Sequence, residues 1–522
     1  MPTSLNYWWV TRPKRKLNSI PEVLAAFSNV ALAVQWSGSR NIHILFEDEL
    51  EKDGLKRVGE RRDHSGSGGR TYQAWLSSLG LIFIQESTGI PYLTLAGEAI
   101  MAGKPPVSIL KEQVLKYQFP SPFGIKTRVS DRFKVHPFIF LLKLIMDSRL
   151  DYLTEEEIAK VVITEGIDDS DRCYEEVVQK VLNFRSYGDS SLPANFIDNH
   201  KPSTGTVNLA HPYSHLTDTA NTMANWLEYT QLVYRDNGAM MISPDAVGEV
   251  KYIINKKWAF IPNPENHEMF QRRYGLDPWH QKDTRNLLNT GSISSKLIDM
   301  QRIRQAFISY SLHKPISKVD AEVIAEIASK TGTDSLLVQQ VLYKEYPHGA
   351  IGGFMSNYYE MAFKGRDEAI DFELATTSIF RDIFGYTATH LGQTGSRSAP
   401  DVLLLSDSEG YQAIIDNKAY SNYSITGDHH NRMILNYIGN IDSYSDYRLP
   451  IGFFSYIAGG FSSSIDRQIM SEYDETNVCG SAISVANMIK LVEQHQQQPY
   501  SHKDLRHLFA VNRQIRIEDL SR

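Results

Sequence analysis

Hydrophobic and polar residues in the last third of the chain follow a regular order that predicts an α/β unit. Apolar residues recur at helical spacing between Asp371 and Phe384. Two short apolar runs, 402–405 and 413–415, then flank a polar turn, which is the pattern of a β-hairpin. A helix at 432–438 and a buried strand at 449–457 are predicted to follow. A helix, a hairpin, a second helix and a strand together form an α/β arrangement.

The first two thirds of the chain show a different pattern, in which a helix is followed by a hairpin and then by another helix. One copy consists of a helix at 71–79, strands at 81–84 and 92–95 and a helix at 96–101; the other consists of a helix at 217–229, strands at 232–234 and 240–242 and a helix at 245–255. This order is typical of winged helices, which read DNA but also serve as protein-binding modules. The chain as a whole is therefore predicted to be α+β, with a mostly helical N-terminal region.

Breaks in these patterns suggest the domain boundaries. A capping box at Thr154–Glu157 opens a helix, and a further helical stretch, 315–342, is interrupted at 331–334. The segment 346–353 is rich in Gly and Pro, as linkers are. We therefore predict four parts: a winged-helix-like subdomain at 1–145, a second, helical and winged-helix-like subdomain at 146–345, a linker at 346–364 and a C-terminal domain at 365–522.

The predicted hairpin carries the strongest candidate chemistry of the chain. Pro400 and Asp401 precede its first strand, and Asp416, Asn417 and Lys418 end its second. Because side chains alternate along a strand, Asp416 and Lys418 project from the same face. Two carboxylates brought together by a hairpin can hold Mg²⁺, and a lysine beside them can orient or deprotonate a water. This combination predicts phosphodiester hydrolysis.

Motifs of this kind also occur by chance, and the chain contains one such copy. Pro244-Asp245 is followed by Glu249-Val250-Lys251, but only three residues separate Asp245 from Glu249. That spacing is too short for a strand, a turn and a second strand. Because the segment falls within a predicted helix, we interpret it as a solvated helix face.

Glu373 lies near the start of the helix that precedes the hairpin, and its role has two interpretations. Its carboxylate could turn toward the metal as a further acidic group of the site. Alternatively, it favours the helix N-terminus, where a negative charge meets the positive end of the helix dipole. The sequence does not separate these alternatives.

The charge distribution favours local binding of nucleic acid. The net charge is −7, yet residues 1–135 hold 18 Lys and Arg against 12 Asp and Glu, while residues 136–522 hold 36 against 49. A basic N-terminal part can bind phosphate while the rest of the chain repels it. The densest basic clusters are 12–16 and 56–62. Each is also compatible with a solvated face, although the second runs into the glycine-rich loop Ser65–Arg70. The DNA-contact candidates are Arg12, Lys14, Arg15, Arg61, Arg62, Arg70 and Arg397.

Other classes of protein fit the sequence less well. No apolar run is long enough for a transmembrane helix, and the N-terminus lacks the apolar stretch of a secretory signal. Two cysteines make a disulfide framework or a zinc ribbon unsuitable and agree with a reducing cytoplasm. No phosphate-binding lysine loop or dinucleotide fingerprint is present, so we expect no nucleotide cofactor. His429-His430 is interpreted as an exposed, phosphate-facing pair.

The C-terminal motifs resemble a known nuclease family. The segments FELATTSIFRDIFGY, GSRSAPD and IIDNKAYS are similar to the cleavage domain of FokI-type type IIS restriction endonucleases, within the PD-(D/E)xK superfamily. The resemblance covers about residues 365–522. It implies that Asp401 and Asp416 hold Mg²⁺, helped by the backbone carbonyl of Asn417, that Lys418 positions the attacking water, and that Glu373 is the helix carboxylate.

The N-terminal segments resemble a second group. WWVTRPKRKLNSIPEVLAAF, KRVGERRD and GRTYQAWLSSLGLIF are similar to AlwI-type restriction endonucleases, whose relatives include strand-specific nicking enzymes. The resemblance implies that residues 1 to about 350 recognise a short asymmetric site in double-stranded DNA and that the rest cuts a few base pairs away. It also implies a bacterial cytoplasmic enzyme with a separately encoded DNA methyltransferase as its companion.

Two function classes remain from the sequence: a Mg²⁺-dependent, sequence-specific endonuclease, and a DNA-binding regulator with a degenerate nuclease fold. The intact set of Asp401, Asp416 and Lys418 favours the enzyme, because a binding protein has no use for it. One chain carries one such centre, which hydrolyses one strand per visit. FokI-type relatives pair their cleavage domains on DNA and nicking relatives do not, so we expect a transient homodimer on DNA, with nicking as the alternative.

Overall fold

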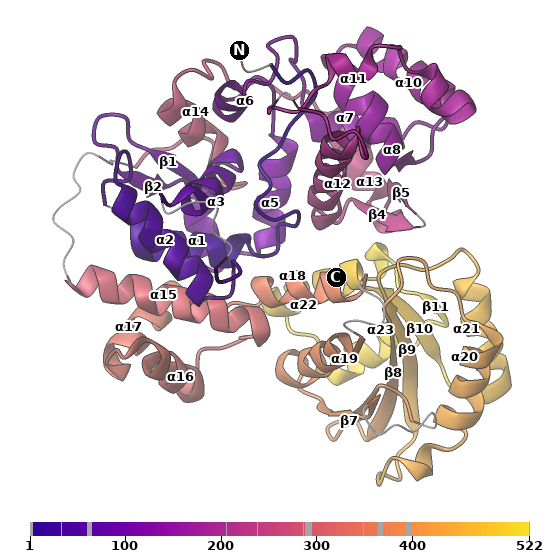
Figure 1. The fold of residues 1–522 in the computed structure, drawn as a ribbon. Helices are drawn as coiled ribbons and strands as arrows, with labels where there is room; N and C mark the ends of the chain where they lie inside the picture. Colours follow the sequence, from indigo (N-terminus) through magenta and orange to yellow (C-terminus); the bar gives the residue numbers. More distant parts are fainter. Residues whose placement is uncertain are drawn as a thin grey trace. The chain divides into compact units, whose positions relative to one another are not determined.

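The structure is a computed structural model that describes residues 4–32, 34–59, 65–204, 206–236, 238–285, 287, 295–347, 349–363, 369–392 and 399–520. The chain divides into two compact units, traced in Figure 1. Unit 1 comprises Met1–Ser309 and Asp320–Tyr346, and unit 2 comprises Tyr310–Val319 and Pro347–Arg522. The described residues thus contain both helices and strands, in agreement with the predicted mixed fold.

Unit 1 is mainly helical. Its helices are α1 (Ile20–Ala31), α2 (Arg40–Lys52), α3 (Ser67–Ser78), α4 (Leu95–Met101), α5 (Pro106–Leu115), α6 (Pro122–Thr127), α7 (Pro137–Ile145), α8 (Glu155–Glu157), α9 (Ile163–Glu165), α10 (Asp171–Tyr187), α11 (Phe196–Asn199), α12 (Ser214–Tyr229), α13 (Val247–Asn255), α14 (His267–Tyr274), α16 (Ala321–Thr331) and α17 (Ser335–Glu345). Helix α15 (Ser295–His313) begins in unit 1 and ends in unit 2. The predicted capping box is present, since the Thr154 and Glu157 side chains bond each other's backbone N–H.

Both predicted hairpins of unit 1 are present. Strands β1 (Ile82–Ile84) and β2 (Pro91–Leu93) pair antiparallel between α3 and α4. Strands β4 (Val233–Asp236) and β5 (Ala239–Ile242) pair antiparallel after α12, and the short strand β3 (Leu153–Thr154) adds to β5. The helix–hairpin–helix order is therefore found at both predicted positions, although this order alone does not establish a winged helix.

A single hydrophobic cluster extends through unit 1, from Leu5 to Tyr274. Its largest fully buried side chains include Trp8, Trp75 and Trp226. Trp226 of α12 stacks on Phe138 of α7, with ring centroids 5.9 Å apart. This core continues across the predicted boundary at residue 145, so residues on both sides of it pack together.

Unit 2 is built on a six-stranded mixed sheet with the strand order β11-β10-β9-β8-β7-β6. The two predicted hairpin strands are β7 (Val402–Ser406) and β8 (Tyr411–Lys418), and they pair antiparallel with Val402 opposite Ile415. The predicted buried strand is β9 (Ile451–Ala458), which runs parallel to β8. The remaining strands are β6 (Thr387–His390), β10 (Gly480–Ser484) and β11 (Arg513–Gln514).

Helices cover both faces of this sheet (Figure 1). On one face, Ile415 and Ile457 join a core formed with α18 (Gly352–Met361), α19 (Ala369–Ser378), α22 (Val485–Gln497) and α23 (His502–Phe509). On the other face, Ile414 and Tyr456 pack against the π-helical turn η7 (Arg432–Ile438), which continues α20 (Gly427–Asn431), and against α21 (Ile465–Thr476). The alternation along β8 and β9 thus places neighbouring residues in different cores.

The segment 346–364, predicted to be a linker, is largely structured. Helix α18 occupies most of it, and Phe354 and Tyr358 of this helix are buried in the core of unit 2. Gly353 lies against Leu312, where an added Cβ would be 2.6 Å from a side-chain carbon. Its glycines therefore permit close packing within unit 2, which sequence composition alone does not distinguish from a flexible connection.

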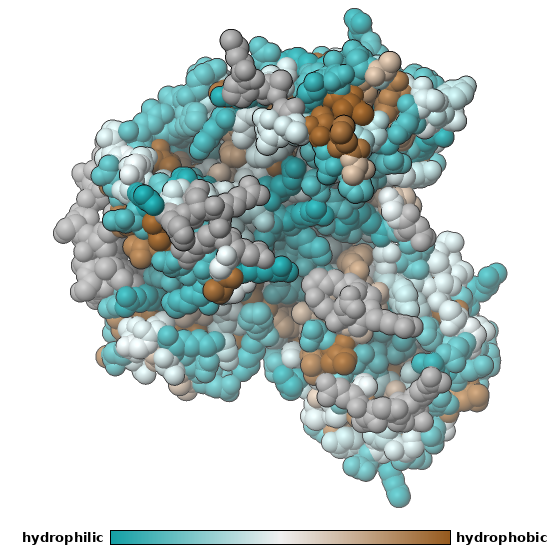
Figure 2. All heavy atoms as spheres, viewed as in Figure 1, coloured by the Kyte–Doolittle hydropathy of each residue, from teal (hydrophilic) through white to brown (hydrophobic). Residues whose placement is uncertain are grey.

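Most of the surface visible in Figure 2 is hydrophilic, and apolar residues form small, separate patches. Exposed large hydrophobic residues, such as Val58 and Leu209, are spread along the chain. Among the described residues no helix is both long enough and apolar enough to cross a membrane.

Candidate active site

The β7–β8 hairpin brings the two aspartates of the motif to the same end of the sheet. Asp401 immediately precedes β7, and Asp416 is the third residue from the end of β8. Since Val402 pairs with Ile415, the next position of each strand places Asp401 opposite Asp416. The hairpin predicted from the apolar runs is therefore present, with the two carboxylates adjacent across it.

Asp416 and Lys418 share one face of β8, as expected from their spacing. Both alternate with Asn417 and lie on the face of Ile414, which packs toward η7 and α21. The Lys418 Nζ lies 2.6 Å from Asp416 Oδ2, and the two side chains are only 13% and 4% exposed. They form a largely buried ion pair.

Asn417 points to the opposite face and fixes the strand to α19. Its side-chain Nδ2 donates to Thr376 Oγ1 at 2.6 Å, and Thr376 Oγ1 lies 2.9 Å from Tyr358 Oη. Its backbone N–H donates to Asp401 Oδ2 at 2.6 Å. Because the N–H and C=O of a strand residue point to the same neighbour, the Asn417 carbonyl is directed toward the Asp401 side.

The proximity of these charges perturbs their protonation. Burial raises the pKa of Asp401 well above its ordinary value, and the charges of Asp416 and Glu373 raise it further. Burial alone would lower the pKa of Lys418, but the carboxylates of Asp416 and Asp401 more than offset this and raise it. Lys418 is therefore a cation in the metal-free chain.

The residues present fit a divalent cation bound by oxygen. Asp416 Oδ1 is buried and has no hydrogen-bond partner in the described part of the chain, whereas Oδ2 is paired with Lys418. Within that same part no group of three or more His, Cys, Asp or Glu side chains is arranged around a common point. Mg²⁺ is commonly held by one or two carboxylates with water and substrate phosphate, so the pair of aspartates and the Asn417 carbonyl is a suitable donor set.

Glu373 lies in α19 and is bonded to a residue that the sequence did not single out. Its Oε2 lies 2.7 Å from His390 Nε2, at the end of β6. Its charge also contributes to the raised pKa of Asp401, so it lies within electrostatic reach of the aspartates. Glu373 therefore lies near the aspartates, and its carboxylate is bonded to β6. Its side chain is largely buried and does not simply face solvent near the helix N-terminus.

The histidines predicted to form an exposed pair instead have partners. His429 Nδ1 lies 2.8 Å from the hydroxyl of Tyr423, and burial together with the charge of Lys418 lowers its pKa. His430 Nε2 lies 2.9 Å from Glu475 Oε1. Both imidazoles are thus partly buried against neighbouring side chains, and their contact with phosphate stays a prediction.

The basic residues predicted to contact DNA have mixed surroundings in unit 1. Arg12 donates to Thr219 at 2.9 Å, and Arg15 pairs with Asp218 at 2.6 Å, so both bind α12. Burial lowers the pKa of Lys14. At the start of α3, Arg70 donates to the backbone carbonyl of Ser65 at 2.7 Å. Arg61, Arg62 and Arg397 lie outside the described residues.

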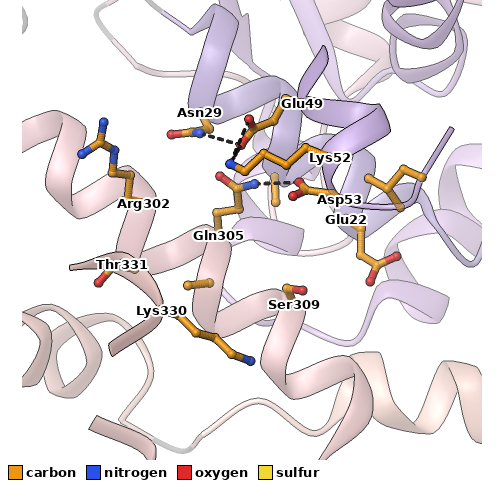
Figure 3. Close-up of a pocket in the computed structure, with 13 residues that line it drawn as sticks. Glu22, Asn29, Glu49, Lys52, Asp53, Arg302, Gln305, Ser309, Lys330 and Thr331 are labelled. Carbon is orange, nitrogen blue, oxygen red and sulfur yellow. Dashed lines mark hydrogen bonds and ion pairs between the residues drawn. The ribbon is translucent and has the colours of Figure 1, made fainter. Parts of the chain in front are cut away.

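Unit 1 also contains a cavity of about 560 Å³ between α1–α2 and α15–α16 (Figure 3). Its lining mixes both charges, and its side chains bond one another: Lys52 pairs with Glu49, and Gln305 donates to Asp53 at 3.1 Å. The second contact joins α15 to the residue that follows α2. The cavity belongs to a different unit from the aspartates, and we assign it no part in the chemistry.

Comparison with known families supports a nuclease relationship for two separate regions. Residues 332–516 match the family model described as the FokI cleavage domain. Residues 107–239 match the model of the N-terminal domain of the type II restriction endonuclease HgaI. The first match contains all of Glu373, Asp401, Asp416 and Lys418, and the second contains all of α12 and β4.

One individual relative points to the same class of enzyme. The type II restriction enzyme StsI of Streptococcus sanguinis is 28% identical over 151 residues, which are 27% of this chain. The matched region spans about a quarter of that relative, 24% of its length.

Solved structures are matched at low identity and low overall overlap. The restriction endonuclease FokI, free and bound to DNA, is 14% and 15% identical over 99% of this chain and 100% of FokI, with a TM-score of 0.29 in both cases. The BpuJ1 endonuclease binding domain, in complex with modified DNA, is 16% identical over 52% of this chain and 97% of that domain, with a TM-score of 0.38. Overlap this low does not by itself establish a shared arrangement.

Proposed function

We propose that this relative of the type IIS restriction enzymes is itself a sequence-specific, Mg²⁺-dependent endonuclease that hydrolyses phosphodiester bonds of double-stranded DNA. The observation that carries the proposal is the pair of Asp401 and Asp416 across the β7–β8 hairpin, with Lys418 bonded to Asp416 at 2.6 Å. A protein that only binds DNA gains nothing from burying two like charges at one sheet end.

The four motif residues, Asp401, Asp416, Asn417 and Lys418, each have a defined part in this chemistry. Bound Mg²⁺ would polarise the scissile phosphate and lower the pKa of a water. Asp401, Asp416 and the Asn417 carbonyl would hold it, which leaves the buried Asp416 Oδ1 satisfied. Lys418 is protonated in the metal-free chain, so it is suited to orienting the attacking water and stabilising negative charge in the transition state.

Residues 1 to about 345 would recognise a short asymmetric sequence, and cleavage would follow a few base pairs away. The match of residues 107–239 to the HgaI N-terminal domain supports this division. The hairpins β1–β2 and β4–β5, each preceded by a helix, are the elements that a winged helix would use. The basic side chains of Arg12, Lys14, Arg15 and Arg70 are the described candidates for phosphate contact.

The decisive test is cleavage of plasmid DNA with Mg²⁺ by the whole chain and by Asp401→Ala and Asp416→Ala. Each variant should lose several orders of magnitude in rate, because a ligand is removed, while retaining specific binding. Asp407→Ala is the matched control, since Asp407 is an exposed carboxylate in the turn of the same hairpin. Cutting at the wild-type rate by either site variant would refute the assignment of the hairpin.

A double-strand break requires a second strand to be cut, and each chain offers one aspartate pair. We therefore propose that two chains associate transiently through residues 365–522 on DNA. The cleavage rate should then rise faster than linearly with enzyme concentration and be higher on plasmids with two sites. Linear kinetics that yield only nicked circles would instead favour a strand-specific nicking enzyme. A separately encoded methyltransferase would protect the host's own sites.

A further inference from the structure

The pair formed by Glu373 and His390 lies outside the aspartate–lysine motif but is directly connected to it. His390 is the last residue of β6 and pairs with Val402, the first residue of β7. The next residue, Leu391, donates its N–H to the backbone carbonyl of Asp401 at 2.8 Å. The edge strand therefore brings His390 close to Asp401, the residue before β7, although ten residues separate the two in sequence.

The side chain of His390 meets Glu373 in a confined space. Ala388 and His390 share one face of β6, and Ala388 packs against the core that contains α19. The His390 Nε2 lies 2.7 Å from Glu373 Oε2, and the two side chains are 10% and 14% exposed. Such limited exposure protects the hydrogen bond from competition with water.

Gly392 provides the room for this pair. A Cβ added at Gly392 would lie 2.0 Å from Glu373 Oε2 and 3.0 Å from His390 Nε2. Any side chain at this position would thus displace the Glu373 carboxylate. The partner histidine thus holds the carboxylate, and the adjacent glycine leaves the space that it occupies.

We propose that His390 is a positioning residue, which donates its Nε2–H to Glu373 and so holds this carboxylate beside Asp401 for catalysis. The proposal rests on the nuclease function proposed above. Partners of this kind orient acidic groups at metal sites, and their loss typically costs about 10–100-fold in activity or metal affinity. His390 would therefore act through Glu373 and would not itself contact DNA or metal.

The kinetic test measures single-turnover cleavage by the full-length chain at saturating enzyme over a range of Mg²⁺ concentrations. His390→Ala should lower the rate by about 10–100-fold while DNA binding in metal-free buffer stays unchanged. His390→Gln should restore most of the rate, because the glutamine amide reaches about as far as Nε2, whereas His390→Asn, one carbon shorter, should not. Thr389→Ala is the matched control, since Thr389 is exposed on the other side of the same strand.

Two further variants separate positioning from a general loss of structure. Gly392→Ala should slow cleavage without removing either group, and His390→Ala should have no additional effect in a Glu373→Ala background, because both remove the same interaction. Thermal unfolding checks that each variant is folded. If His390→Ala is unfolded, the contrast between His390→Gln and His390→Asn decides the question.

A second readout does not depend on activity. In the metal-free chain labelled with ¹⁵N-histidine, His390 should be protonated at Nε2, and its signal should shift in Glu373→Ala. If the wild-type chain cuts DNA and His390→Ala cuts it at the same rate, the positioning role alone is overturned. If the wild-type chain cuts no DNA but His390 shows this hydrogen bond, the proposed function is overturned and the pairing is intact. A His390 without a proton on Nε2 would overturn the pairing.

Discussion

Neutralising Asp401 should stabilise the metal-free protein although it removes a metal ligand. The Asp401 carboxylate is held next to Asp416 and Glu373 in a buried setting that raises its pKa, so its charged form is disfavoured. Asp401→Asn keeps an oxygen that can accept the Asn417 N–H but removes the charge. Relief of a buried, poorly compensated charge is worth about 1–3 kcal/mol. For a unit of the size of unit 2, this corresponds to a rise of roughly 2–12 °C in its unfolding temperature.

The same substitution at Asp416 should have the opposite effect on stability. Asp416 Oδ2 is the counter-ion of the buried Lys418 Nζ, at 2.6 Å. Asp416→Asn leaves that ammonium group without its partner, and removing one member of a buried ion pair typically costs about 3–5 kcal/mol. The two aspartates should thus be equally necessary for cleavage and opposite in their effect on the metal-free fold.

The assay is thermal or urea unfolding of the full-length variants in chelator-containing buffer from pH 5 to pH 9. Since the pKa of Asp401 is higher in the folded state than in the unfolded state, its protonation stabilises the wild type at low pH, and this stability is lost as the pH rises through the folded-state value. The advantage of Asp401→Asn should therefore grow with pH. Equal shifts in both variants, or an Asp401→Asn variant less stable than the wild type above neutral pH, would refute this account of the site.

Three further predictions concern other parts of the chain. Thr376→Val should destabilise unit 2 by about 1–3 kcal/mol and slow cleavage, because it removes the partner of Asn417 Nδ2; Thr377→Val, whose hydroxyl only bonds within α19, is the control. Burial raises the pKa of Glu472 to about 8, so stability should fall more steeply between pH 7 and pH 9 in the wild type than in Glu472→Gln, as unfolding curves would show. A fragment of residues 1–350 should bind one short sequence in a randomised selection, without cutting, with affinity that falls steeply as salt increases.

The sequence predicted the site most accurately where the signal was local. The apolar runs on both sides of a polar turn specified β7 and β8, and the two-residue period placed Asp416 and Lys418 on one face. The helix before the hairpin was also predicted, although it ends in a π-helical turn, η5 (Ile379–Ile383). Each of these features depends on neighbours within about twenty residues, which periodicity can capture.

Features that depend on contacts between distant segments were not predictable in this way. The short edge strand β6 has an ordinary sequence, Thr387–His390, and only its pairing with β7 brings His390 to the site. The dipeptide Leu391-Gly392 after it was the available signal, since a glycine at a strand end can mark a close approach. The glycine-rich segment after Tyr346 was predicted to be a linker because composition does not report that Gly353 packs on Leu312.

Helix α19 is bonded to two of the strands that form the site. Helix α19 contacts the sheet end through two successive turns: Glu373 bonds His390 of β6, and Thr376 bonds Asn417 of β8. Asp401 precedes β7, the strand between β6 and β8. Its side chain accepts the Asn417 N–H, and its backbone carbonyl accepts the Leu391 N–H. Asp401, whose pKa is raised by its surroundings, is therefore positioned by β6 and β8, and α19 is bonded to both of these strands. A small displacement of α19 should therefore alter the spacing of the two aspartates and slow cleavage.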